Sequence, residues 1–301
     1  MFPKPSNELW TWSARVAWVA LPFTAGIALA DAIDGWSRGP AIVAMVFLWA
    51  AWLAGAVALF APRPWGFAIL RVVAPSAVVV AALASAPGAV RITGIAVAVL
   101  AAALALGAPI ARASANAVAY GDEDRYPLTV PPTIALAPLP VAIAVIGFEL
   151  AGGPLLIADG RIVAGIVALV VGLPLAALAA NSVFSLSRRW FVLVPAGAVI
   201  VDPLTLADPI LLPREQLVSL RPGADGAALD LRLGPARGPL TITLREPAPF
   251  VRRRGRAGAA VASTDVVRIG VVDRDRLLEI GPRRRLPVHA ATPPPSTTSP
   301  S

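Results

Sequence analysis

The chain has 301 residues, a formal net charge of +8, no cysteine and a single histidine, and 57% of its residues are hydrophobic. Only 15% are charged, whereas soluble domains usually carry about 25%, so lipid is the expected main solvent. The missing thiols and the lone His289 exclude disulfides, thiol catalysis and metal sites built from Cys or His. We therefore expect no cofactor and no metal.

Six segments approach the length of about 20 mostly apolar residues that a membrane-spanning helix needs. They are residues 15–33, 40–61, 65–86, 93–112, 130–151 and 162–184. The third and fifth segments contain prolines, so five spans, or one re-entrant segment, remain alternatives. The first ends in Ala28-Leu29-Ala30, which is similar to a signal-peptidase site, but the early Trp10 and Trp12 favour a retained helix. The sequence predicts a transmembrane helical bundle over residues 1–187.

The placement of cations predicts the orientation of these segments. Ends and loops on one side hold the larger set, and those on the other side hold Arg38, Arg91 and Arg161. The larger set consists of Lys4, Arg15, Arg63, Arg71, Arg112, Arg125, Arg188 and Arg189. We therefore expect a multi-pass protein of the cell membrane with both termini in the cytoplasm.

Few ionisable groups lie within the predicted spans, where charge is costly and often functional. Arg71 is expected near the cytoplasmic end of its helix, where it can reach the surface, and Glu149 near the outer end of the fifth segment. Prolines recur in the spans and can kink helices around a substrate path, although they are also common in ordinary bundles. Between the fourth and fifth segments, the carboxylates of Asp122, Glu123 and Asp124 could bind a cation, but a solvated loop is favoured.

Small residues recur at every fourth position of the sixth segment, which would let another backbone approach closely. They are Ala164, Ala168, Gly172, Ala176 and Ala180. The partner could be another helix of this chain or a second copy.

The last third of the chain differs in both charge and pattern. Residues 188–301 hold 17 arginines and 10 acidic residues, a net charge of +7. Residues 190–202 are rich in β-formers, leucines alternate over 229–233, and Leu240, Ile242 and Leu244 alternate with threonines, which is typical of half-buried strands. A further strand is expected over 266–272, then a short helix capped by Asp273. The Pro- and Ser-rich tail, residues 289–301, should be disordered.

Residues 188–194, the strand 199–201 and the segment 210–220 resemble the opening of a bacterial pleckstrin-homology-like (PH-like) domain. The resemblance covers residues 188–286, within a predicted domain over 188–288 on the cytoplasmic side. It implies a small curved β-sheet structure closed by a C-terminal helix, and it implies no reaction. A Gly/Arg-rich insertion over 252–262 departs from that pattern. The whole chain is also similar to multi-pass membrane proteins of actinobacteria.

Arginines cluster in this region and can contact anionic lipid headgroups, each adding about 1 kcal/mol. The candidates are Arg188, Arg189, Arg252, Arg253, Arg254, Arg256, Arg283, Arg284 and Arg285. A solvated face is the alternative, and no nucleic-acid contact is expected because aromatic residues do not alternate with the arginines.

The leading interpretation is a non-enzymatic membrane anchor or scaffold that presents a cytoplasmic interaction domain. Its partners would be the lipid bilayer and another membrane protein or a second copy. The alternative is a small transporter or membrane enzyme with a site among kinked helices.

Overall fold

The computed structural model describes residues 5–84, 88–223, 227–253 and 258–289, and the chain divides into two compact units. The first unit is helical and consists of Met1–Tyr120 and Thr133–Arg188. The second unit is rich in strands and consists of Gly121–Pro132 and Arg189–Ser301. The division falls near residue 188, and the short segment Gly121–Pro132 also belongs to the second unit.

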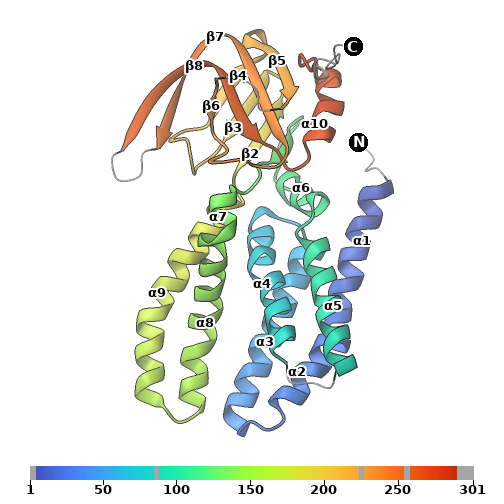
Figure 1. Cartoon of the computed structure of the whole chain (residues 1–301), viewed down its shortest axis with the longest axis vertical. Coiled ribbons are helices and arrows are strands. Elements are labelled where there is room, and N and C mark those ends of the chain that lie inside the picture. The colour runs from blue at the N-terminus through green and yellow to red at the C-terminus, as the bar shows by residue number, and fades with distance from the viewer. Residues whose placement is uncertain (1–4, 85–87, 224–226, 254–257, 290–301) are drawn as a thin grey trace, which may run out of the picture. The chain divides into compact units, whose positions relative to one another are not determined.

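Long helices make up the first unit (Figure 1). In chain order they are α1 (Pro5–Ala20), α2 (Ala25–Ile33), α3 (Arg38–Phe60), α4 (Pro64–Leu83), α5 (Gly88–Ala105), α6 (Ala108–Asn116), α7 (Pro132–Leu136), α8 (Pro138–Ala158) and α9 (Ile162–Leu186). Within the described residues, six helical stretches are long and apolar enough to cross a membrane, with α1 and α2 counted as one stretch. The prediction of about six apolar helices followed by a β-rich region is confirmed at this level.

Prolines and glycines shift the helix boundaries from the predicted ones. The fifth long helix begins at Pro138, eight residues after the predicted start, because Pro138 lies at the helix N-terminus, where a missing N–H is tolerated. The predicted fourth segment divides at Gly107 into α5 and α6. The first helix begins at Pro5, and the 3-10 turn Leu21–Phe23 (η1), which contains Pro22, separates α1 from α2.

The core of the helical unit is built mostly from alanine. Its largest buried cluster combines a few large side chains, such as Trp18 and Leu70, with eleven alanines from α1 to α6. Glycines permit the closest approaches: a Cβ on Gly94 would lie 3.1 Å from the Cα of Ala25, and one on Gly55 would overlap the Trp18 indole. Many large apolar side chains of the same helices face outward, including Val163, which is 77% exposed.

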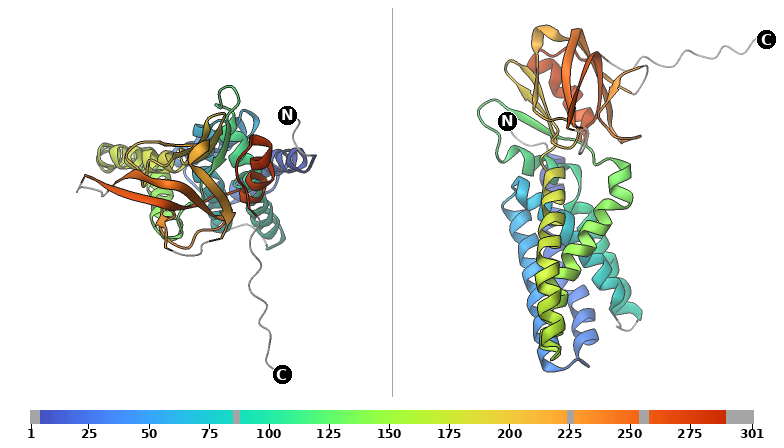
Figure 2. Two further views of the ribbon diagram at one scale, coloured as in Figure 1. Left: turned by 90° about the horizontal axis from the view of Figure 1, so that it is seen from above. Right: turned by 90° about the vertical axis from the view of Figure 1, so that its left-hand side faces the viewer.

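The helices α8 and α9 form an antiparallel pair (Figures 1 and 2). On α9, Gly172 and Ala176 are buried and Ala168 is half-buried, but Ala164 and Ala180 are exposed. The buried positions of α9 are Gly165, Gly172, Ala176, Val183 and Leu186. A stripe of every fourth residue drifts by about 40° per step around a helix with 3.6 residues per turn. The packed face therefore coincides with the predicted stripe only near its centre.

The second unit contains two four-stranded sheets, ordered β1-β2-β3-β4 and β5-β7-β8-β6 (Figure 1). The strands are β1 (Asp124–Pro127), β2 (Trp190–Val194), β3 (Gly197–Val201), β4 (Ile210–Pro213), β5 (Leu217–Pro222), β6 (Leu229–Asp230), β7 (Pro239–Arg253) and β8 (Ala259–Gly270). The helix α10 (Arg274–Ile280) follows at the position that the sequence predicts.

The alternating leucines give one correct and one incorrect strand prediction. Leu240, Ile242 and Leu244 are buried in β7, as expected. The predicted strand over 229–233 is shorter: β6 covers only Leu229–Asp230, and the backbone of Leu233 is left-handed with φ of 56°. Within the Gly/Arg-rich segment 252–262, Arg252 and Arg253 belong to β7 and residues 259–262 belong to β8, and the two strands pair.

The acidic segment before α7 is only partly the solvated loop that its composition suggests: Asp122 lies in an exposed turn, whereas Asp124 is buried and begins strand β1. β1 pairs antiparallel with β2, which places Tyr126 opposite Phe191. Tyr126 is fully buried and its hydroxyl donates to Asp124 Oδ2 over 2.8 Å. The β-rich unit therefore requires a segment from between two helices of the first unit.

Candidate functional site

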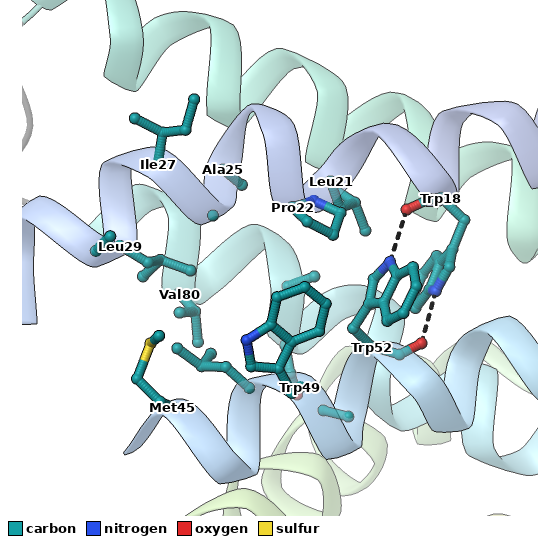
Figure 3. A pocket seen from close by; sticks show the side chains of 16 residues that line it. Trp18, Leu21, Pro22, Ala25, Ile27, Leu29, Met45, Trp49, Trp52 and Val80 are labelled. Atoms are coloured by element: carbon teal, nitrogen blue, oxygen red, sulfur yellow. Dashed lines mark hydrogen bonds between the residues drawn. The ribbon is translucent and has the colours of Figure 1, made fainter. Parts of the chain in front are cut away.

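A cavity of about 360 Å3 lies in the helical unit between the interrupted first helix, α3 and α4 (Figure 3). Ligand pockets typically measure about 300–1,000 Å3, so this cavity can hold a small molecule or one chain. Its lining residues are Trp18, Leu21, Pro22, Ala25, Gly26, Ile27, Leu29, Ala30, Met45, Leu48, Trp49, Ala51, Trp52, Ser76, Ala77 and Val80.

The interruption of the first helix creates one wall of the cavity. Pro22 has no backbone N–H to donate, and the chain forms a 3-10 turn there instead of continuing α1. The Thr24 hydroxyl donates to the carbonyl of Ala20 over 3.0 Å, which satisfies an acceptor that the break leaves without a helical partner. Residues before the turn, such as Trp18, and after it, such as Ile27, then line the same cavity (Figure 3).

Two tryptophans join α1 to α3 at one end of the cavity. Trp18 Nε1–H donates to the Trp52 carbonyl over 2.9 Å, and Trp52 Nε1–H donates to the Trp18 carbonyl over 3.0 Å (Figure 3). Trp49 packs edge-on against Trp52 with ring centroids 5.4 Å apart. The reciprocal bonds satisfy both indole donors, so these rings present mainly apolar surface to the cavity.

The chemical character of the cavity is that of a hydrocarbon site. No charged side chain is among its lining residues. The hydroxyl of Ser76 donates to the carbonyl of Val72 over 2.8 Å and is thereby satisfied within its own helix. A water molecule takes up about 30 Å3 of liquid, and a methylene group is of similar size. The cavity therefore has room for about a dozen methylene groups and offers no group for acid, base or nucleophilic chemistry.

A second cavity, of about 450 Å3, has a different lining. It is bounded by the start of α3 and by α8 and α9, with Trp36, Ser37 and Asp159 among its residues. Its lining also includes Glu149, which the boundaries of α8 place in the middle of that helix and not near its end as the predicted segment implied. Among the described acidic residues of the helical unit, Glu149 lies farthest from the ends of its helix.

Arg71 also differs from its expected position. The side chain is only 9% exposed, and its Nη1–H donates to Ser187 Oγ over 3.0 Å at the end of α9. Its guanidinium also lies over the Phe67 ring, 4.8 Å from the centroid. Arg71 thus joins α4 to the end of α9, and the expectation that it extends to the surface is corrected.

Arg189 is not available for the lipid contact expected of it. Its Nε and Nη2 donate to the two carboxylate oxygens of Asp202 over 2.7 and 2.8 Å, and both side chains are almost completely buried. Nη1–H donates to the carbonyl of Thr129 over 2.8 Å. An arginine that directly follows a helix looks like a membrane anchor in the sequence, but here the fold encloses it beside a carboxylate of the next hairpin.

The other candidate arginines have mixed surroundings. Arg188, Arg253, Arg283 and Arg285 are exposed, and Arg252 is half-buried. Arg253 Nε–H donates to the carbonyl of Leu206, and Arg284 donates to the carbonyl of Asp122. Arg254 and Arg256 lie outside the described residues. The cations able to meet a lipid surface are therefore the exposed ones of this set.

A second ion pair of the β-rich unit lies next to the short strand β6. Arg232 donates to both carboxylate oxygens of Asp230, with distances of 2.9 and 2.7 Å, and Arg268 lies 3.9 Å away. Burial raises the pKa of Asp230, but the hydrogen bonds and charge of Arg232 outweigh it and hold that pKa below its usual value. Arg232 is thus held in an ion pair with Asp230.

The sequence indicates prolines that can kink the spans, and Pro22 of the cavity lining is one of them. It does not single out the tryptophans of the cavity. The available signal was the depth of Trp18, Trp49 and Trp52, which lie inside spans, whereas tryptophans of membrane proteins favour the interfaces. Among the described residues, no group of three or more His, Asp or Glu side chains is arranged to hold a metal ion. Comparison with protein families, curated proteins and solved structures found no match.

Proposed function

We propose that this chain is a non-enzymatic, multi-pass membrane protein whose helical unit binds one hydrocarbon chain of a lipid and anchors a β-rich interaction domain. The observation that carries the proposal is the charge-free cavity behind the interrupted first helix. A transporter or enzyme for a polar substrate would need convergent polar groups, and this cavity is lined by tryptophan, aliphatic and alanine side chains.

The distribution of side-chain size supports membrane insertion. In the helical unit the buried cluster is mostly alanine, while large apolar side chains such as Val170 and Leu178 are 69% and 66% exposed. In water such exposure would be costly, because each buried aliphatic side chain contributes about 1.5–3 kcal/mol. In lipid it costs nothing, and small residues at helix contacts are the rule.

The proposed topology has both termini in the cytoplasm, on the arginine asymmetry described above. Reporter fusions after Arg38, Arg91 and Arg161 should report the outside, and fusions after Arg63, Arg125 and Arg189 the inside. An external signal from the Arg189 fusion would overturn this orientation.

The β-rich unit is proposed as a PH-like domain that rests near anionic lipid. Two sheets and the closing helix α10 agree with the architecture that the resemblance implies. The exposed cations Arg188, Arg253, Arg283 and Arg285 supply the contacts. Hydrogen exchange of the full chain in neutral and anionic nanodiscs tests this: protection of the second unit should rise with anionic lipid and decline with salt, since screening shortens the reach of charge.

A lipid chain is the occupant that the cavity's chemistry favours. The lining offers contact to apolar groups along its length, and every indole donor of the Trp18–Trp52 pair is already bonded. The cavity also lies beside helices long and apolar enough to cross a membrane, where a lipid chain is the most abundant apolar ligand.

The test fills the cavity and counts the lipid retained. Ala77 lines the cavity, while Val79 lies two residues along the same helix, is 56% exposed and is not part of the lining. Native mass spectrometry of the full chain should detect a bound lipid that Ala77→Phe removes and Val79→Phe retains. Equal lipid retention in both variants would contradict the proposed site.

A further inference from the structure

The second cavity of the helical unit contains a carboxylate at the depth where charge is most costly. Glu149 lies eleven residues after Pro138 and nine before Ala158, the two ends of α8. At a rise of 1.5 Å per residue, it is about 15 Å from either end. The hydrocarbon layer of a bilayer is about 30 Å thick, so in the inserted protein Glu149 lies close to its centre.

The surrounding helices make room for this side chain but give it no cation. A Cβ on Gly172 would overlap Glu149 Oε2, so the carboxylate rests directly on the backbone of α9 where only glycine fits. No cationic side chain is among the residues that line this cavity. A charge in such surroundings is stable only if it is paired, hydrated or neutralised by a proton.

Charged groups on the helices packed against α8 lie elsewhere. α9 carries none between Ile162 and Leu186, α3 carries Arg38 at its start, and α4 carries Arg71, which is bonded to Ser187. At the loop end of α8, Asp159 and Arg161 form an exposed pair 3.1 Å apart. The proton is therefore the partner that remains for Glu149.

The cavity supplies a route from that loop end. Its lining extends from Glu149 through Gly152 and Gly153 to Asp159, with Trp36 and Ser37 on the opposite side. The ten residues from Glu149 to Asp159 correspond to about 15 Å along the helix. Gly152 leaves space beside the α8 backbone, because a Cβ there would meet only the Phe148 ring at 3.8 Å, and the far end carries polar groups.

We propose that Glu149 is a proton-binding site that exchanges with water at the α8–α9 loop end through this cavity. The proposal rests on membrane insertion of the bundle and is independent of the lipid in the first cavity. Protonation there would couple the packing of α8 on α9 to the pH on one side of the membrane.

The test labels the full chain in sealed liposomes with dicyclohexylcarbodiimide, an apolar reagent that reacts with protonated carboxyl groups. Peptide mass spectrometry should find the adduct at Glu149, and Glu149→Gln should lack it. Raising the pH on the loop side alone should lower the labelling several-fold, and raising it on the other side should not. Absent labelling, labelling indifferent to pH, or the opposite sidedness would overturn the proposal.

Two pairs of variants test the route. Gly152 lines the cavity, whereas Gly147 is exposed and has nothing within 4 Å of an added Cβ. Gly152→Leu should slow the pH response several-fold and Gly147→Leu should not; equal responses would contradict the route. If Gly152→Leu fails to fold, Ser37→Cys can be blocked with a bulky thiol reagent, because the chain has no other cysteine. Ile162→Cys, 58% exposed and outside the lining, is its control.

A water-soluble carbodiimide tests membrane insertion of α8 separately from the one-sided route to Glu149. If it modifies Glu149 as fast as the apolar reagent does, the carboxyl faces bulk water and membrane insertion of α8 fails. If the apolar reagent alone reacts but without sidedness, insertion stands and the one-sided route is wrong.

Discussion

The two units of this protein bury opposite kinds of residue. The main cluster of the helical unit is mostly alanine, whereas the cluster of the β-rich unit contains leucine, isoleucine, valine and aromatic side chains, with Ala198 as its alanine among the described residues. In water, stability comes from removing large apolar surface. Helices in lipid gain nothing from that transfer, so close backbone packing decides their association. The difference is the one expected if the helical unit lies in lipid, as proposed, and the β-rich unit in water.

Both units also enclose an arginine, but by different means. In the β-rich unit Arg189 meets a carboxylate that accepts two of its N–H groups. In the helical unit Arg71 is bonded to a hydroxyl and lies over an aromatic ring. The first arrangement depends on a charge pair and should be the more sensitive to removal of its partner.

Asp202→Ala should have the largest effect. It leaves the buried Arg189 guanidinium without its counter-charge, and breaking a buried pair in this way typically costs about 3–5 kcal/mol. Asp275, whose side chain is 84% exposed beside Arg274, provides the control, because Asp275→Ala should cost less than about 1 kcal/mol. Chemical unfolding of the full chain in detergent, followed by proteolysis of the second unit, measures both; similar losses would mean that the pair is not buried.

Ile242→Ala should follow in size. Ile242 is fully buried, and shortening such a side chain typically costs about 2–5 kcal/mol. Leu178→Ala in the helical unit should change stability by less than about 0.5 kcal/mol, because Leu178 is 66% exposed. A comparable loss from Leu178→Ala would mean that this face of α9 packs against protein, such as a second copy.

Gly172→Leu tests the packing rule for the helical unit. The new side chain would displace Glu149 and force α8 from α9, and overpacking of this kind typically costs about 1–3 kcal/mol. Leu173→Ala, at a position 48% exposed, should do less. Thermal stability in detergent compares the two, and an unchanged midpoint for Gly172→Leu would show that the α8–α9 contact is loose.

The smallest expected effect is the loss of folding stability at low pH that results from the Asp230–Arg232 pair. The pKa of Asp230 in the folded chain lies below the ordinary value of 3.8, despite the opposing effect of burial, because Arg232 donates to it. A depressed folded pKa contributes stability that is present above the unfolded value and is lost as the pH falls through the folded one. The unfolding midpoint should therefore decline below pH 3.8, and Arg232→Gln should flatten that decline. An identical acid profile in the variant would leave the pair without a role in stability.

Local pattern was sufficient for much of the architecture. Hydropathy located three of the six long apolar helices to within a few residues at both ends, since about 20 apolar residues in a row have few alternatives to a spanning helix. Period-two alternation found the buried strand through Leu240 and Leu244, and Asp273 marked the start of α10. These features depend on residues close together in the chain. The sequence could therefore predict them by itself.

Tertiary structure alone decided the positions that matter most for function. The pairing of β1 with β2 brings Gly121–Pro132 into the β-rich unit, and the partner of Arg189 lies thirteen residues further on, across a hairpin. The start of α8 at Pro138 moves Glu149 from a helix end to the middle, against Gly172. The apolar cavity needs three helices to form. Contacts between distant residues create these features, and no window of the sequence contains both partners.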